Sequence, residues 1–123
     1  MNGEVPVCMI CVEPISNFIC PGCLYKAVQQ WLWGAGPELI ERFRDFHKQF
    51  VESVVSHKTA ICISCRKEYY HMVCPYDYIR ETYLWLYEFL PKRRLKEFMK
   101  IFSFGFKRVG ENIRNWMFCT AGA

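Results

Sequence analysis

The chain has 123 residues, of which 52% are hydrophobic and 17% aromatic, and its formal net charge at pH 7 is +4. So much apolar side chain excludes a disordered tail, and the length suits one compact domain or two very small ones. Charges or Gly and Pro interrupt every apolar stretch before the roughly 18 residues of a membrane helix, so no membrane span is expected. The first residues lack the basic and apolar regions of a secretory signal, which predicts an intracellular protein, cytoplasmic or nuclear.

The cysteines form a pattern that repeats along the chain. Six of the eight belong to three C-x-x-C pairs, and two thiolates at that spacing can bind one tetrahedral zinc ion. Without a secretory signal, this pattern favours metal binding over disulfide bonds. A shift of 54 residues superimposes a first ligand set on a second, together with the proline after the third ligand, which predicts two Zn²⁺ per chain. The expected cysteine ligands are Cys8, Cys11, Cys20 and Cys23 in the first set, and Cys62, Cys65 and Cys74 in the second.

The fourth ligand of the second set has two candidates. The strict register of the repeat places Asp77 where Cys23 stands, whereas His71 is the commoner kind of zinc ligand but has no ligand at its equivalent position. The other two histidines, His47 and His57, fall outside any ligand spacing and are expected at the surface. Because each copy is complete in itself, the repeat favours sequential pairing, with one ion in each set. A cross-braced arrangement would instead join the first C-x-x-C pair to the third.

Each ligand set lies in the same predicted local structure. A knuckle at the first C-x-x-C is followed by eight residues, enough for a short β-hairpin, and then by a helix. Pro21 and Pro75 suit the first position of these helices, where the missing N–H costs nothing. This order resembles the treble-clef class of zinc finger, and the MYND, HIT and PHD fingers use related pieces. The resemblance implies a first finger at 5–33 and a second at 59–90, and it identifies no single family.

The segments between and after the fingers are predicted to be helical. Residues 37–57 carry apolar side chains at helical spacing and form a long amphipathic linking helix. Residues 76–90 are apolar nearly all round and must be buried on more than one side, as a core helix or as a homodimer interface. Residues 91–118 form basic C-terminal helices. The expected fold of 1–123 is therefore a single, mainly α domain with two short β-hairpins and duplicated treble-clef-like fingers.

Positive charge is concentrated after residue 91. Residues 92–123 carry eight basic and two acidic side chains, whereas residues 1–91 carry eight basic and ten acidic ones. Basic clusters supply the sequence-independent part of nucleic-acid affinity, although similar patterns occur on solvated helix faces and at anionic membrane surfaces. The candidate nucleic-acid contacts are Lys92, Arg93, Arg94, Lys96, Lys100, Lys107 and Arg108.

The motifs favour structural rather than catalytic zinc. A site with four protein ligands leaves no open position on the metal. The chain also has no H-E-x-x-H, no phosphate-binding glycine loop and no G-x-S-x-G. We therefore expect no enzyme and no small-molecule substrate, but a nucleic-acid-binding or regulatory zinc-finger protein. The alternative is a RING-, PHD- or HIT-like adaptor that binds other proteins and no nucleic acid.

Overall fold

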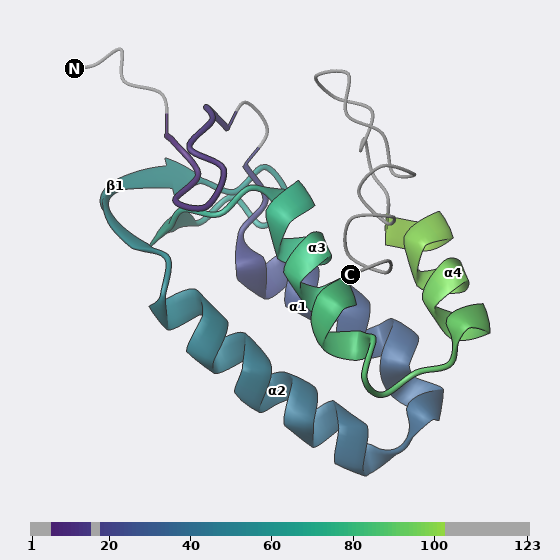
Figure 1. The fold of residues 1–123 in the computed structure, drawn as a ribbon. Coiled ribbons are helices and arrows are strands. Elements are labelled where there is room, and N and C mark those ends of the chain that lie inside the picture. The colour runs from purple at the N-terminus through teal and green to yellow at the C-terminus, as the bar shows by residue number, and fades with distance from the viewer. Residues whose placement is uncertain (1–5, 16–17, 103–123) are drawn as a thin grey trace. The chain divides into compact units, whose positions relative to one another are not determined.

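The computed structural model describes residues 6–15 and 18–102 (Figure 1). The chain falls into two compact units, Met1–Tyr78 and Ile79–Ala123, and each is described by itself. In chain order the elements are α1 (Pro21–Trp31), the 3-10 helix η1 (Leu32–Ala35), α2 (Pro37–Glu52), β1 (Val55–Ile61), β2 (Glu68–His71), α3 (Pro75–Leu86) and α4 (Lys92–Phe102).

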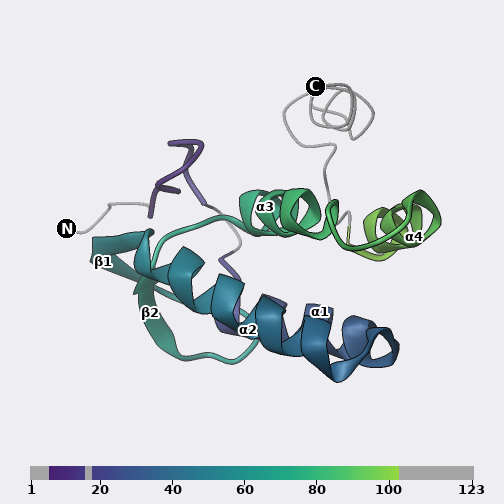
Figure 2. The ribbon, with the colours of Figure 1, turned by 60° about the horizontal axis from the view of Figure 1, so that its bottom comes forward.

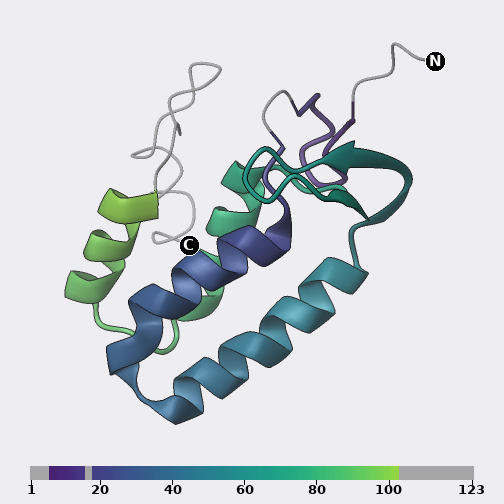
Figure 3. The same cartoon turned by 180° about the vertical axis from the view of Figure 1, so that it is seen from behind.

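Helices α1 and α2 of the first unit form an antiparallel hairpin with η1 at its turn (Figure 3). Leu24 and Val28 lie on the buried face of α1. The turn ends at Gly36, whose φ of 107° is one that side-chain-bearing residues rarely adopt, and Pro37 then opens α2. This glycine therefore lets the chain reverse between the two helices.

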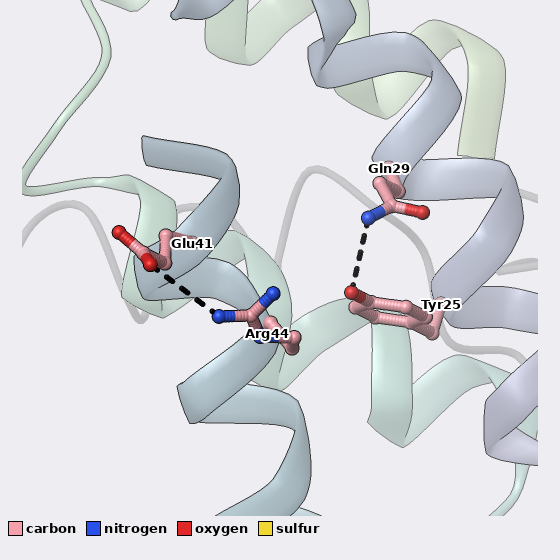
Figure 4. Close-up of polar contacts among 4 residues, drawn as sticks. All are labelled: Tyr25, Gln29, Glu41 and Arg44. Atoms are coloured by element: carbon pink, nitrogen blue, oxygen red, sulfur yellow. Dashed lines mark hydrogen bonds and ion pairs between the residues drawn. The ribbon is translucent and has the colours of Figure 1, made fainter. Parts of the chain in front are cut away.

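Aromatic and polar contacts fix the helical hairpin. The Tyr25 ring of α1 stacks on Phe43 of α2 with 5.1 Å between ring centroids. Gln29 restrains that ring, because its Nε2 donates to the Tyr25 hydroxyl at 3.1 Å (Figure 4). The pair between Arg44 and Glu41 on α2 is exposed, at 3.5 Å, and contributes little to stability (Figure 4).

Strands β1 and β2 form an antiparallel hairpin at the end of α2 that lies away from η1 (Figure 2). Ala60 pairs with Tyr69 and Ile61 with Glu68, and the register shifts between Val55 and Ala60. The strands flank the second knuckle, whereas the sequence placed the hairpin after it. In the described part of the first finger, the counterpart is a single bridge between Val7 and Pro14.

The linking helix is shorter than predicted. Helix α2 ends at Glu52, and its predicted last turn lies instead at the start of β1. The apolar spacing continues through Val54 and Val55, but these β-branched residues suit a strand. The N–H of Met72 donates to the Val54 carbonyl at 2.9 Å, so pairing with the second half of the finger decides the conformation here.

Helix α4 of the second unit is strongly amphipathic. Its buried side chains are Leu95, Phe98, Met99 and Phe102. Helix α3 ends at Leu86 rather than near residue 90, and the predicted helical segment after residue 102 lies outside the described residues. The homodimer through 76–90 stays a prediction. Among the helices of the described residues, none has the length and apolar character that crossing a membrane requires.

Candidate metal centre

Two groups of four ligand side chains gather in the first unit. We call them the four-thiol cluster and the Asp77 cluster, and within each the ligand atoms all lie within 4.8 Å of one another. The four-thiol cluster contains Cys20, Cys23, Cys62 and Cys65, and the Asp77 cluster contains Cys8, Cys11, Cys74 and Asp77. The seven predicted cysteines are thus divided between two groups of metal-binding composition.

Distances in the four-thiol cluster fit a tetrahedral metal. The Sγ atoms of Cys20 and Cys65 are 3.9 Å apart, and those of Cys23 and Cys62 are 3.8 Å apart. Zinc–sulfur bonds of about 2.3 Å at the tetrahedral angle place two sulfurs about 3.8 Å apart. A disulfide would need about 2.05 Å, and these cysteines are free. The cluster therefore has the dimensions of a four-thiolate zinc site.

The Asp77 cluster fits the same geometry with one oxygen ligand. The Oδ2 atom of Asp77 lies 3.2 Å from the Sγ of Cys8 and 3.3 Å from that of Cys74, and the Sγ atoms of Cys11 and Cys74 are 4.0 Å apart. A zinc–oxygen bond of about 2.0 Å places the oxygen about 3.5 Å from each sulfur. Asp77 is only 5% exposed, although a carboxylate of this kind is costly to bury without a cation or donors.

Of the two candidates for the fourth ligand, the structure brings only Asp77 to the cysteines. Asp77 follows Cys74 by three residues in the first turn of α3, so both lie on one side of the helix start. His71 belongs to neither cluster. Its backbone pairs with Val55 in the β-hairpin, and its ring contacts Tyr70 at 5.0 Å between centroids. The register of the repeat thus predicts the position better than the usual ligand preference does.

The pairing of the ligands differs from both arrangements considered from the sequence. Each cluster joins the knuckle of one repeat to the helix start of the other. The first C-x-x-C pair therefore shares a cluster with Cys74 and Asp77, and the second C-x-x-C pair shares a cluster with the third. The N–H of Cys20 donates to the Sγ of Cys62 at 3.3 Å, and the N–H of Cys74 donates to the Sγ of Cys8 at 3.3 Å. Sequential pairing is therefore wrong, and so is the cross-brace.

Further backbone bonds between the copies obey the same symmetry. The N–H of Met9 donates to the Met72 carbonyl at 2.9 Å, and the N–H of Ile63 donates to the Phe18 carbonyl at 2.9 Å. A shift of 54 residues converts Met9 into Ile63 and Phe18 into Met72, so each bond is the counterpart of the other. Each repeat thus contacts the other through the same pair of positions, as in an approximate two-fold symmetry within one chain.

Hydrogen bonds prepare thiols of both knuckles for metal binding. The Cys74 side chain, helped by backbone N–H groups that include that of Ile10, lowers the pKa of Cys8 to about 6. Burial raises the pKa of Cys62, but the N–H groups of Cys20, Cys65 and Ser64 outweigh it and lower that pKa to about 6. Metals bind the thiolate, so these two sulfurs are ready ligands near neutral pH.

Two other thiols of the clusters, those of Cys11 and Cys20, are held protonated in the absence of a cation. Burial, followed by the hydrogen bond to Asp77, raises the pKa of Cys11 to about 11. Burial also raises the pKa of Cys20 to about 12. A bound divalent cation offsets both the desolvation and the repulsion among ligands, which is why metal binding to such sites releases protons. The electrostatics of the two clusters thus favour metal occupancy.

One histidine, His47, which the sequence placed at the surface, is half-buried and contacts two tyrosines. The Nδ1 atom of His47 is 2.8 Å from the Tyr78 hydroxyl, and its ring stacks on Tyr25 with 4.4 Å between centroids. Burial, with a smaller effect of His71, lowers the pKa of His47 to about 4. This contact ties α2 to the first turn of α3, in which Asp77 stands. No ligand spacing in the sequence could have revealed it.

The predicted basic residues fall partly on α4. Lys92, Arg93, Lys96 and Lys100 are exposed, whereas Arg94 is half-buried and pairs with Glu97 at 3.0 Å. Lys107 and Arg108 lie outside the described residues. At about 100° per residue, the four exposed cations occupy an arc of about 100° on the helix. We call these four residues the basic face of α4; it borders the buried arc of that helix, and the centres of the two arcs lie about 120° apart around the helix axis.

Comparison of the chain with protein-family models, with curated proteins and with solved structures found no match. The two clusters have the composition of zinc-binding knuckles, and this composition assigns no family. The function must therefore be argued from the metal clusters and the surfaces themselves.

Proposed function

We propose that this chain is a non-catalytic zinc protein built from two treble-clef-like repeats that exchange their metal ligands, and that it binds nucleic acid through the basic face of α4. The zinc ions would be structural, one in each cluster. The basic face would contact phosphates without reading bases. The single observation that carries the nucleic-acid part is the grouping of four exposed cations on one side of α4.

The ligand count supports a structural role for the metals. Each cluster supplies four side-chain ligands, which complete the tetrahedral shell that zinc takes in structural sites. A catalytic zinc instead keeps one position for water or substrate. When bound, the ions would hold the two repeats together, because each cluster takes ligands from both. Zinc binding and folding should therefore be linked.

The spacing of the cations supports contact with a phosphate backbone. Lys92, Lys96 and Lys100 recur at every fourth residue, and Arg93 lies beside them. The helical rise spreads them over about 12 Å, and duplex DNA carries one charge per roughly 1.7 Å of its axis. Lysine-rich stripes of this kind bind phosphates by charge rather than by base-specific geometry. The expected ligand is therefore nucleic acid of any sequence.

The test measures binding of the zinc-loaded chain to a fluorescently labelled DNA duplex of about 20 base pairs by fluorescence anisotropy. With four contacts, affinity should fall about a hundredfold between 50 and 200 mM salt. The triple variant K92A/K96A/K100A should bind every sequence more weakly. The slope of log affinity against log salt concentration should become shallower by about one unit per contact removed. The matched control is R42A/R44A, because these exposed cations of α2 already pair with Glu38 and Glu41. Absence of binding at low salt, or equal loss in the control, would exclude this function.

A further inference from the structure

The two repeats provide a pair of knuckles with the same backbone and different side chains. The N–H of Val12 donates to the Cys8 carbonyl at 3.0 Å, and the N–H of Arg66 donates to the Cys62 carbonyl at 2.9 Å. Val12 and Arg66 both have positive φ, 61° and 65°. We call residues 8–13 knuckle 1 and residues 62–67 knuckle 2. Each serves as a structural control for the other.

The exposed side chains of the two knuckles differ in kind. Knuckle 1 shows an apolar surface, with Val12 72% exposed, Met9 48% and Ile10 36%, and the exposed Glu13 at its edge. Knuckle 2 keeps one exposed apolar residue and is otherwise polar and basic. Its residues at the equivalent positions are Ile63, Ser64, Arg66 and Lys67. Only knuckle 1 therefore presents several apolar side chains within one tight turn.

Val12 has a backbone conformation that disfavours valine in the folded protein. A β-branched side chain is a marked outlier at positive φ, because it crowds its own backbone. At 72% exposure, little packing compensates for that strain. Arg66 closes the same turn in knuckle 2, so the turn itself does not require valine. Strained residues of this kind gather at functional sites, which makes Val12 a candidate contact residue.

We infer that knuckle 1 is a docking surface for a protein segment that carries an apolar side chain next to lysine or arginine. Met9, Ile10 and Val12 would cover the apolar side chain, and the flexible thioether of Met9 adapts to its shape. Glu13 at the edge of the knuckle complements a basic residue and disfavours acidic partners. The same carboxylate argues against nucleic acid at this knuckle. The inference is independent of the nucleic-acid function proposed for α4.

The test selects peptides from a random phage-displayed library on the zinc-loaded full chain and measures their affinities by fluorescence anisotropy. Selected peptides should place Lys or Arg beside an apolar residue. Asparagine tolerates positive φ, so Val12→Asn should keep the turn but lower the affinity for the selected peptides at least tenfold. The matched variant Arg66→Asn should change that affinity less than twofold. Glu13→Gln should weaken them several-fold, more at low salt than at high salt.

Three results would overturn the inference. The first is selection of peptides without a basic residue, or of peptides that bind wild type and Val12→Asn equally. The second is self-association of the chain that Val12→Asn abolishes in sedimentation, because the occupant would then be a second copy. The third is loss of DNA-duplex binding in Val12→Asn. If this variant fails to retain two zinc ions per chain, Met9→Gln with Ile63→Gln as its matched control replaces it in the same measurements.

Discussion

The backbone N–H of Cys74 donates to the Sγ of Cys8 at 3.3 Å, so the last ligand pair of the chain closes on the first. Its counterpart joins Cys20 to Cys62 at the same distance. Neither knuckle thus completes a metal cluster with the helix that follows it in the sequence. The metal sites, if filled, would act as clamps between the two repeats rather than as the centres of two independent fingers.

Pairs of ligand replacements test this exchange by counting the metals that remain. Cys8→Ser with Asp77→Asn removes two ligands of one cluster, so one zinc ion per chain should be lost. Cys8→Ser with Cys23→Ser damages both clusters, so two should be lost. Native mass spectrometry under non-denaturing conditions gives the count. Sequential pairing requires the reverse pattern, and Cys8→Ser with Cys62→Ser would remove only one ion in a cross-braced protein.

The sequence predicts the ligands and the helix starts better than it predicts the pairing. The seven cysteines, the position of Asp77 and the prolines that open α1 and α3 follow from local spacing and register. Which knuckle meets which helix depends on bonds between residues far apart, such as Cys74 and Cys8. Because both copies have the same spacing, exchanged and unexchanged clusters have the same composition, with four cysteines in one and three cysteines and Asp77 in the other. Local patterns therefore carry no signal that separates them.

The end of α2 is a second feature that local sequence patterns do not predict. Helical apolar spacing continues past Glu52, but the backbone after Ser53 finds its partners in the second half of the finger. The environment of His47 also depends on Tyr25 and Tyr78, which come from two other helices. Long-range pairing and packing decide these features, and a local pattern cannot contain them.

The two clusters should differ in metal affinity because one has an oxygen in place of a sulfur. Soft cations prefer thiolates, so one equivalent of Cd²⁺ should enter the four-thiol cluster first. During chelator competition the Asp77 cluster should lose zinc first, and Asp77→Cys should tighten it at least tenfold, which is about 1.4 kcal/mol. Measurement of the two stepwise zinc dissociations by chelator titration checks this. Identical affinities in wild type, or no change in Asp77→Cys, would contradict it.

Protonation of His47 should destabilise the fold. Its folded pKa, about 4, lies below the ordinary 6.5, so the unfolded chain binds the proton more strongly. The stability that neutral His47 contributes is complete above pH 6.5 and is lost as pH falls toward 4. Since the side chain is only partly buried, we expect a loss of about 1 kcal/mol between pH 7 and 5.

The His47 prediction is checked by denaturant unfolding of zinc-loaded wild type and His47→Gln at several pH values. Protonation of metal ligands affects both proteins, so the informative quantity is the difference between their unfolding free energies. That difference should shrink as pH falls from 7 to 5. The exposed His57 offers the matched control His57→Gln, for which the difference from wild type should stay constant. A pH-independent difference for His47→Gln would refute the prediction.

Val12→Asn should make the protein more stable while it weakens docking at knuckle 1. Positive φ costs a β-branched residue roughly 1–2 kcal/mol, and asparagine adopts it more readily. We expect a gain of about 1 kcal/mol in unfolding free energy, or several degrees in the thermal midpoint of the zinc-loaded chain. Arg66→Asn, at the same φ in knuckle 2, relieves no β-branched strain and should gain less. If Val12→Asn proves neutral or destabilising, valine is not strained there, and the argument that it is retained for binding fails with it.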